Sequence, residues 1–313
     1  MALVLRGGGQ QLQGIESSVQ DGTVIVKPAP FDYVAPTTVA QVVDTLADES
    51  RDAKVIAGGQ SLLPMLNLRL AHPELLIDVR RVQGLGRLGV DDTSSLVVGA
   101  GITQAAAMAD PAVQRGWPLL AAGISHIGHP QIRNRGTVCG SIAHHDSAAE
   151  LPTLALALDA TFRVASSTGT REVAAQDMFV ATFMTALEAG DLLTEVVVPA
   201  QPAGTGWSFR EFSRRRGDFA TVGVAVLLRR DGPRIHEARV VFCGAGSTPV
   251  RSRRAEEALV GAPPEAKVLD AARQELARDL DPPEDVHATA EFRQEMAGEL
   301  FAAAVGQAWE RSS

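Results

Sequence analysis

The stretch from residue 127 to residue 152 combines residue types that suit binding of an anion, and it shows neither the period of a strand nor that of a helix. Its centre is a run of small residues, namely Thr137, Val138, Cys139, Gly140 and Ser141. Glycine lets the main chain approach a phosphate, and oriented backbone N–H groups can form an anion-binding nest. Glu150 follows at a distance that could reach a sugar hydroxyl. The alternative is a tight turn between two strands, because short glycine-rich matches are weak evidence.

A second stretch has the same character. A short apolar and β-branched run over residues 54–57 leads into a Gly-Gly-Gln-Ser turn, and residues 62–70 then predict a short helix or a further turn. The residues of interest are Val55, Ile56, Ala57, Gly58, Gly59, Gln60, Ser61 and Leu62. Two such loops in one chain suit the two phosphates of a dinucleotide. Neither is a G-x-G-x-x-G fingerprint or a G-x-x-x-x-G-K-[ST] loop.

Three motifs in order along the chain resemble one known family. Residues 57–64 with 67–71 resemble the first flavin loop of the FAD-binding medium subunits of molybdenum hydroxylases, the xanthine dehydrogenase and aerobic carbon monoxide dehydrogenase type. Residues 131–141 resemble the second flavin loop, and residues 214–220 resemble the third signature, at the start of the C-terminal domain. The resemblance extends from about residue 28 to about residue 307.

The resemblance assigns a role to each candidate residue. It implies that the first loop and residues 137–141 hold the pyrophosphate of FAD, and that the carboxylate of Glu150 reaches the ribose or adenine end. Ile127 and Leu193 match apolar positions against the cofactor. Phe219 matches a position beside the isoalloxazine where several relatives carry tyrosine; phenylalanine keeps the stacking face but lacks the O–H.

Cys139 is a second departure from the family pattern, because relatives usually have glycine there. A left-handed backbone at this position would cost a cysteine about 1 kcal/mol or more. We therefore expect a negative φ at Cys139, or a shifted loop.

The expected fold class is α+β, with the FAD-binding PCMH-type arrangement of two small α/β subdomains followed by a C-terminal antiparallel sheet with helices. The boundaries are an N-terminal extension over 1–26, a first subdomain over 27–85, a second over 86–200 and a C-terminal domain over 207–313. Residues 199–206, rich in Pro and Gly, form the linker.

Within this frame, residues 162–164, 171–173 and 193–198 predict strands of one sheet, and Thr37 or Thr38 caps a helix. In the C-terminal domain we expect strands over 207–212, 219–228 and 235–243, and helices over 255–260, 266–280 and 290–309. Residues 244–249 predict the end of a strand and then a threonine cap, with Pro249 opening a helix.

Composition excludes several classes of function. The 313 residues carry a formal charge of −8, which argues against a general nucleic-acid binder. No apolar run approaches the roughly 18–20 residues of a membrane span, and the N-terminus does not read as a secretory signal, so we expect a cytoplasmic protein. Two cysteines, Cys139 and Cys243, cannot supply the four thiolates of an iron–sulfur cluster.

Two other kinds of site are weak alternatives. His144, His145, Asp146 and Glu150 could be read as metal ligands, but adjacent histidines point apart on a helix or strand. Ser141 and Ser147 could suggest a hydrolase, but no G-x-S-x-G elbow is present. We expect no metal ligand and no catalytic side chain in this chain.

The resemblance implies a flavin electron-transfer subunit. Its expected partners are a large subunit with the molybdopterin cofactor and a small subunit with [2Fe–2S] clusters, assembled as a dimer of heterotrimers, together with an external electron acceptor. A stand-alone flavin-dependent oxidoreductase with its own substrate site, and a flavin-free structural subunit, are the competing hypotheses. The substrate of the complex, the acceptor and the role of residues 1–26 are left open.

Overall fold

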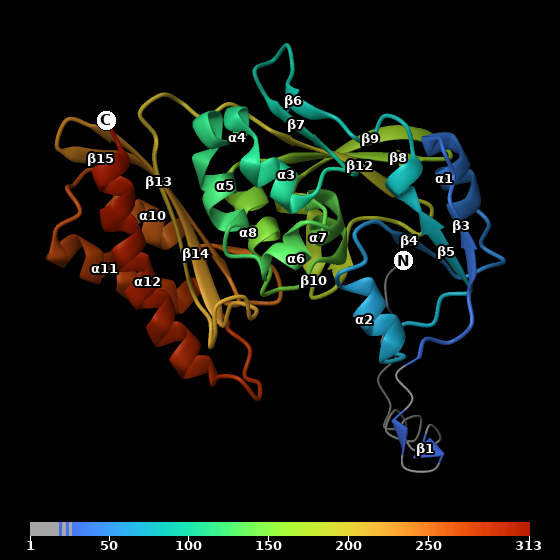
Figure 1. Ribbon diagram of the computed structural model, residues 1–313. Helices are drawn as coiled ribbons and strands as arrows, with labels where there is room; N and C mark the ends of the chain where they lie inside the picture. The colour runs from blue at the N-terminus through green and yellow to red at the C-terminus, as the bar shows by residue number, and fades with distance from the viewer. Residues whose placement is uncertain (1–18, 21–22, 25–26) are drawn as a thin grey trace.

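The computed structural model describes residues 19–20, 23–24 and 27–313. The predicted N-terminal extension, 1–26, therefore lies outside the described residues except for one short antiparallel pair, β1 (Val19–Gln20) with β2 (Thr23–Val24). The remainder forms two large parts that meet at a group of central helices (Figure 1).

The first unit is a parallel three-stranded sheet in the order β3-β5-β4, made of β3 (Asp32–Val34), β5 (Leu75–Asp78) and β4 (Ala53–Ile56). The helix α1 (Val39–Leu46) connects β3 to β4. Thr38 caps this helix, as predicted, in a capping box with the side chain of Gln41. Parallel strands place their carboxyl ends at one edge, where α/β sheets bind ligands.

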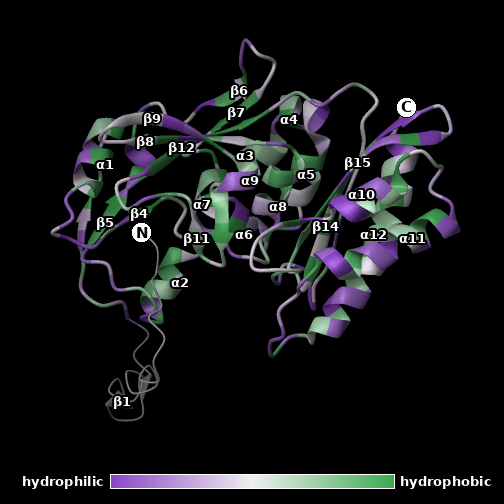
Figure 2. Cartoon of the chain, turned by 180° about the vertical axis from the view of Figure 1, so that it is seen from behind, coloured by the Kyte–Doolittle hydropathy of each residue, from purple (hydrophilic) through white to green (hydrophobic). Residues whose placement is uncertain are grey.

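A five-stranded antiparallel sheet follows, in the order β6-β7-β12-β8-β9, and it contains all three strands expected of one sheet. Its members are β6 (Leu88–Val90), β7 (Leu96–Gly99), β12 (Leu192–Val198), β8 (Thr161–Ser166) and β9 (Gly169–Ala174). Figure 2 shows that β9, at the edge, is largely hydrophilic, whereas β5 of the parallel sheet is mostly hydrophobic and becomes charged only at Asp78.

Six helices fill the middle of the molecule, between this sheet and the C-terminal part (Figure 1). They are α3 (Gln104–Ala109), α4 (Pro111–Gly116), α5 (Pro118–Ile124), α6 (Pro130–Arg133), α7 (Val138–His144) and α8 (Glu150–Ala157). Buried side chains of α3, α4, α5, α7 and α8 join those of both N-terminal sheets in one continuous core. The short α9 (Ala175–Met178) and the pair β10 (Phe179–Ala181) and β11 (Met184–Thr185) follow β9.

The C-terminal part is an antiparallel sheet of β13 (Gly206–Phe212), β14 (Val222–Asp231), β15 (Arg234–Cys243) and β16 (Val250–Arg251). Three helices cover its outer face: α10 (Arg253–Leu259), α11 (Ala266–Asp279) and α12 (Ala290–Arg311). Residues 222–228 are buried without alternation because α5 and α8 cover the inner face.

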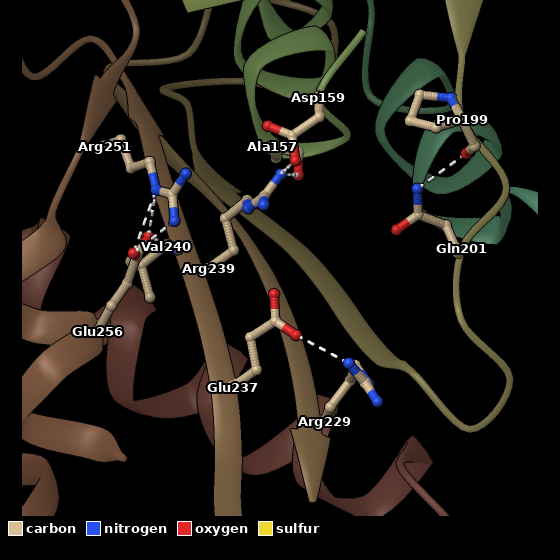
Figure 3. Close-up of polar contacts among 10 residues, drawn as sticks. All are labelled: Ala157, Asp159, Pro199, Gln201, Arg229, Glu237, Arg239, Val240, Arg251 and Glu256. Carbon is tan, nitrogen blue, oxygen red and sulfur yellow. Dashed lines mark hydrogen bonds and ion pairs between the residues drawn. The ribbon is translucent and has the colours of Figure 1, made fainter.

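Polar contacts join the two parts of the molecule (Figure 3). Arg239 on β15 donates to the carbonyl oxygen of Ala157 at the end of α8, at 3.1 Å, and forms an ion pair with Asp159. A cation near the last carbonyls of a helix is favourable because those oxygens carry partial negative charge.

Two local predictions were wrong. Pro249 opens no helix: β16 follows it and pairs with β15, and α10 begins only after Ser252, whose side chain accepts from the N–H of Ala255. Residues 219–221 are not part of a strand, since β14 begins at Val222.

Candidate functional site

The first candidate loop leaves the carboxyl end of β4. Gly59 has φ +73°, a left-handed conformation that glycine adopts at no steric cost. In the described part of the chain, the backbone N–H groups of Gly59, Gln60 and Ser61 donate to no other protein group. Three successive free donors on a turn suit an anion such as a phosphate. The helix α2 (Leu62–Asn67) begins where the loop ends.

The second candidate segment is the first turn of a helix, so the prediction of a loop over residues 137–141 was wrong. Thr137 caps α7, and its Oγ1 accepts from the N–H of Gly140 at 3.0 Å. Val138 and Ile142, one turn apart, are both buried. Val138 donates its N–H to the carbonyl of Ile102, so among residues 137–141 only the N–H groups of Thr137 and Cys139 have no acceptor in the described part of the chain and can serve a ligand.

The two segments are in direct backbone contact although nearly 80 residues separate them. A Cβ added at Gly58 would lie 2.1 Å from the carbonyl oxygen of Arg135 and 2.7 Å from the Cα of Gly136. A Cβ at Gly140 would be 3.9 Å from the Cβ of Ala57. No residue other than glycine fits at position 58 unless one of the two backbone segments moves. The contact of Gly58 with Arg135 and Gly136 was not predicted, because a sequence does not show which distant segment a glycine will pack against.

Cys139 lies within the helix and does not have a positive φ, which agrees with the expected conformation. Its side chain is 2% exposed, and its Sγ is 3.6 Å from the carbonyl oxygen of Val98 on β7. The sulfur thus fills the core behind the helix. Burial raises the pKa of the thiol, which keeps it protonated and unreactive.

Asp78 lies beside the first loop, and its negative charge is compensated by Arg80. Asp78, at the end of β5, is paired in register with Ile56 of β4. Burial alone would raise its pKa, but hydrogen bonds from Arg80 and the hydroxyl of Tyr33 outweigh burial and lower the pKa to about 2. Arg80 contacts both carboxylate oxygens. The carboxyl end of the parallel sheet can therefore receive an anion without strong repulsion from Asp78.

Glu150 is buried at the start of α8, with 5% of its surface exposed. Burial, and next the charge of Glu211, raise its pKa to about 8. Oε1 of Glu211, on β13, lies 3.3 Å from Nδ1 of His126. Neither Glu211 nor His126 is among the candidates predicted from the sequence. The signal was the alternation along β13, which places Glu211 on the inner face with Trp207 and Phe209.

The other three candidates are placed differently. Ile127 is half-buried beside this cluster, and its carbonyl accepts from Arg133 Nη1 at 2.7 Å. Leu193 is 5% exposed, opposite Val164 in the core. Phe219 is 66% exposed in the turn between β13 and β14.

That turn reaches the central helices. A Cβ at Gly217 would be 2.4 Å from Cε1 of His129, so the turn that carries Phe219 packs on the segment that follows Ile127. The third motif of the sequence thus approaches the second in space.

The two adjacent histidines contact different neighbours. The ring of His144 lies 4.9 Å from that of Phe183, and the ring of His145 lies 4.7 Å from that of Phe179. Nδ1 of His145 is bonded to the carbonyl of Ala181 at 2.8 Å. Over residues 19–20, 23–24 and 27–313, no three His, Cys, Asp or Glu side chains are grouped so that they could hold a metal ion.

Comparison with known proteins identifies the family. Residues 29–201 match a family described as "FAD binding domain in molybdopterin dehydrogenase", and residues 207–308 match "CO dehydrogenase flavoprotein C-terminal domain". The chain belongs to the family of FAD-binding subunits of molybdenum hydroxylases. The resemblance seen in the three motifs is confirmed, and so is the α+β fold.

Individual members of this flavoprotein family match over nearly their full length. The chain is 40% identical over 269 residues to the 6-hydroxypseudooxynicotine dehydrogenase complex subunit alpha of Paenarthrobacter nicotinovorans, covering 86% of this chain and 90% of that one. It is 36% identical to the carbon monoxide dehydrogenase medium chain of Hydrogenophaga pseudoflava, covering 91% and 99%. A solved carbon monoxide dehydrogenase from the same organism superposes with a TM-score of 0.88 at 37% identity, over 91% of this chain and 99% of that one.

The flavoprotein subunit is thus part of an oxidoreductase, and FAD is its cofactor. The geometry fits this cofactor, because two segments with free donors meet at a glycine contact beside a compensated carboxylate. None of the helices in the described part of the chain is long and apolar enough to cross a membrane.

Proposed function

We propose that this flavoprotein subunit relays electrons within a heteromeric molybdenum hydroxylase, taking them from [2Fe–2S] clusters of a partner subunit and passing them to an external acceptor. The observation that carries the proposal is the contact of Gly58 with Arg135 and Gly136, which joins two donor-bearing segments into one cradle. FAD supplies a carrier that can accept electrons singly and release them as a pair.

The residues proposed to hold the cofactor are the same as those predicted from the sequence. Residues 55–62 and 137–141 would provide backbone donors to the pyrophosphate. Glu150 and Ile127 would lie along the remainder of the cofactor, and Phe219 would approach from the turn after β13. Leu193 would support the site from the core. The role of the protein is binding, orientation and electrostatic tuning, and no side chain need be a general base.

Partners follow from what the chain lacks. Its two cysteines, Cys139 and Cys243, are both buried and unpaired, so they cannot ligate a four-thiolate cluster. We propose a large molybdopterin-binding subunit and a small iron–sulfur subunit, in a dimer of heterotrimers. Two free thiols support a reducing, cytoplasmic location. The division into units 27–85, 86–200 and 207–313 stays a prediction.

The isolated chain provides the first test. The purified polypeptide, reconstituted with FAD, should show a flavin absorbance spectrum that small organic substrates of molybdenum hydroxylases do not bleach. Bleaching at ordinary enzyme rates, of order 1–10³ s⁻¹, would instead support a self-contained flavin oxidoreductase with its own substrate site. Failure to bind FAD at all would leave only a structural subunit.

A further inference from the structure

The connection of β13 to β14, residues 213–221, exposes a large aromatic side chain beside charged ones. In this β13–β14 turn, Phe219 is 66% exposed, and the consecutive arginines Arg214, Arg215 and Arg216 are exposed as well. One face of the Phe219 ring is therefore free for a ligand, which agrees with its proposed place against the cofactor.

The start of α12 holds both ends of the β13–β14 turn. The ring of Phe292 packs edge-on against Phe212, the last residue of β13, with 5.5 Å between ring centroids. The next residue, Arg293, donates from Nη1 to the carbonyl oxygen of Thr221, the last residue before β14. The N–H of Thr221 in turn donates to the carbonyl of Phe212 at 2.8 Å. Two neighbouring residues of one helix thus fix the base of the turn.

The tip of the β13–β14 turn has a separate support. A Cβ at Gly217 would lie 2.4 Å from Cε1 of His129, so the tip packs closely on this ring. His129 is the residue before α6, and Gly136, which follows α6, contacts Gly58 of the first cofactor segment. The turn is therefore held at its base by the C-terminal part and at its tip by the segment that leads into the cofactor cradle.

The burial of Arg293 is only partly compensated. The side chain is almost fully buried, with Nη2 paired to Asp285 Oδ2 at 2.8 Å and Nη1 bonded to the carbonyl of Thr221. Its Nε has no hydrogen-bond partner among the described residues. A buried ion pair often contributes less to stability than apolar side chains of the same size. The stability of the fold thus gives little reason for an arginine here, whereas its reach to Thr221 gives a direct one.

We propose that Arg293 is a positioning residue for the cofactor site: together with Phe292 it holds the base of the β13–β14 turn, and through this turn it places Phe219 against FAD. Because Arg293 is buried, it acts without touching the cofactor itself. The part of this inference that concerns FAD rests on the proposed function, in which Phe219 approaches the cofactor. The hold of α12 on the turn does not rest on it.

Limited proteolysis of the purified full-length chain without FAD tests the hold on the turn. Trypsin cleaves after arginine, so its rate of cleavage at residues 214–216 reports how often the turn opens. Arg293→Met keeps a long side chain and removes both hydrogen bonds. Cleavage at 214–216, identified by the masses of the fragments, should be at least about tenfold faster in this variant.

Two further variants accompany this measurement. Phe292→Leu removes the ring contact with Phe212 at a side chain that is 38% exposed, so the chain should fold and cleavage should again be faster. Arg273→Met is the matched control, because it removes an ion pair with Glu299 of α12 that involves no residue of the turn. The control should be cleaved at the wild-type rate.

A double-mutant cycle on FAD binding tests whether Arg293 acts through Phe219. Phe219→Ala removes the proposed contact and should raise the dissociation constant by about fivefold or more. Arg293→Met should also raise it. In a chain that already carries Phe219→Ala, Arg293→Met should raise it no further, because no aromatic side chain is left to position. Flavin fluorescence titration measures all four constants.

Equal cleavage rates in Arg293→Met and the wild type would overturn the hold on the turn. An effect of Arg293→Met on FAD binding that is the same with and without Phe219 would overturn its action through Phe219. Near-ultraviolet circular dichroism confirms that each variant is folded; if Arg293→Met does not fold, Phe292→Leu takes its place in both measurements with the same outcomes. A wild-type chain that does not bind FAD would refute the proposed function, and proteolysis alone would then decide the hold on the turn.

Discussion

At Gly58 the absence of a side chain decides whether the two cofactor segments can touch. The hydrogen in place of a Cβ lets the turn after β4 meet the carbonyl of Arg135, 2.1 Å from where a Cβ would lie. Gly59 next to it supplies the left-handed φ that turns the chain toward α2. One glycine is therefore needed for close approach and the other for backbone conformation.

Gly58→Val should separate the two segments and weaken FAD binding by about ten- to a hundredfold, since forced overpacking costs about 1–3 kcal/mol. Flavin fluorescence titration measures the dissociation constant. Gly116→Ala is the control, because a Cβ there meets nothing within 4 Å. A Gly58→Val chain that binds FAD as tightly as the control would refute the proposed cradle.

Glu150 should make stability depend on pH. Its pKa is about 8 in the folded chain and its ordinary value is 4.5, so the folded state keeps a proton that the unfolded state releases. The free energy of unfolding should therefore fall between about pH 4.5 and pH 8, by a few kcal/mol in total, and level off above pH 8. Urea unfolding at pH 5.5 and pH 8 measures this.

Glu150→Gln removes the titrating group, so the difference in stability between the two pH values should be smaller in the variant than in the wild type. Parallel pH dependence of the two proteins would show that Glu150 does not hold the proton.

Among the elements, the junction of α8 with β15 is one of the contacts that join the two parts of the molecule. Arg239 contacts the last turn of α8 and the carboxylate of Asp159, a residue with φ +51° (Figure 3). Because Arg239 is mostly buried, its contact is worth more than a surface ion pair. The same junction encloses Glu150, so its loosening would disturb the candidate site.

Arg239→Ala should lower the free energy of unfolding by about 1–3 kcal/mol, because it leaves the carbonyl of Ala157 and the carboxylate of Asp159 without their partner. Arg229→Ala removes a more exposed pair with Glu237 on the same sheet and should cost less than about 1 kcal/mol. Equal losses in denaturant unfolding of the two variants would contradict this ranking.

Element type was predictable where periodicity or a cap is local. Thr38 caps a helix as expected, and the three C-terminal helices form over the predicted residues to within two residues at each end. The helix at Val138 was not predicted, because its glycine and small residues favour a turn and its seven residues show too little of the helical period. The prediction of a helix at Pro249 was wrong because β16 forms by pairing with β15, and no local sequence pattern predicts this pairing.

For the whole molecule, the three motifs correctly predicted the family and the cofactor, since they are the segments by which the sequence resembles FAD-binding proteins. They did not predict the contact between Glu211 and His126, which depends on which face of β13 meets the central helices. Contacts between segments that are distant in sequence depend on how the two cores pack, and local periodicity in one sequence does not predict them.

The relay also makes a claim about the assembled complex. In the proposed relay, the electrons that reach the flavin come from an iron–sulfur partner, because the two cysteines of this chain cannot ligate a cluster. Omission of that partner from the complex should therefore stop electrons from reaching the flavin.

The most direct measurement is the rate of flavin bleaching in the reconstituted complex after addition of the hydroxylase substrate, with and without the small iron–sulfur subunit. With all three subunits present, the flavin should bleach at ordinary enzyme rates, of order 1–10³ s⁻¹. Without the small subunit, bleaching should stop even though the molybdenum subunit is present. Bleaching that continues at the same rate without the small subunit would contradict the electron-relay account.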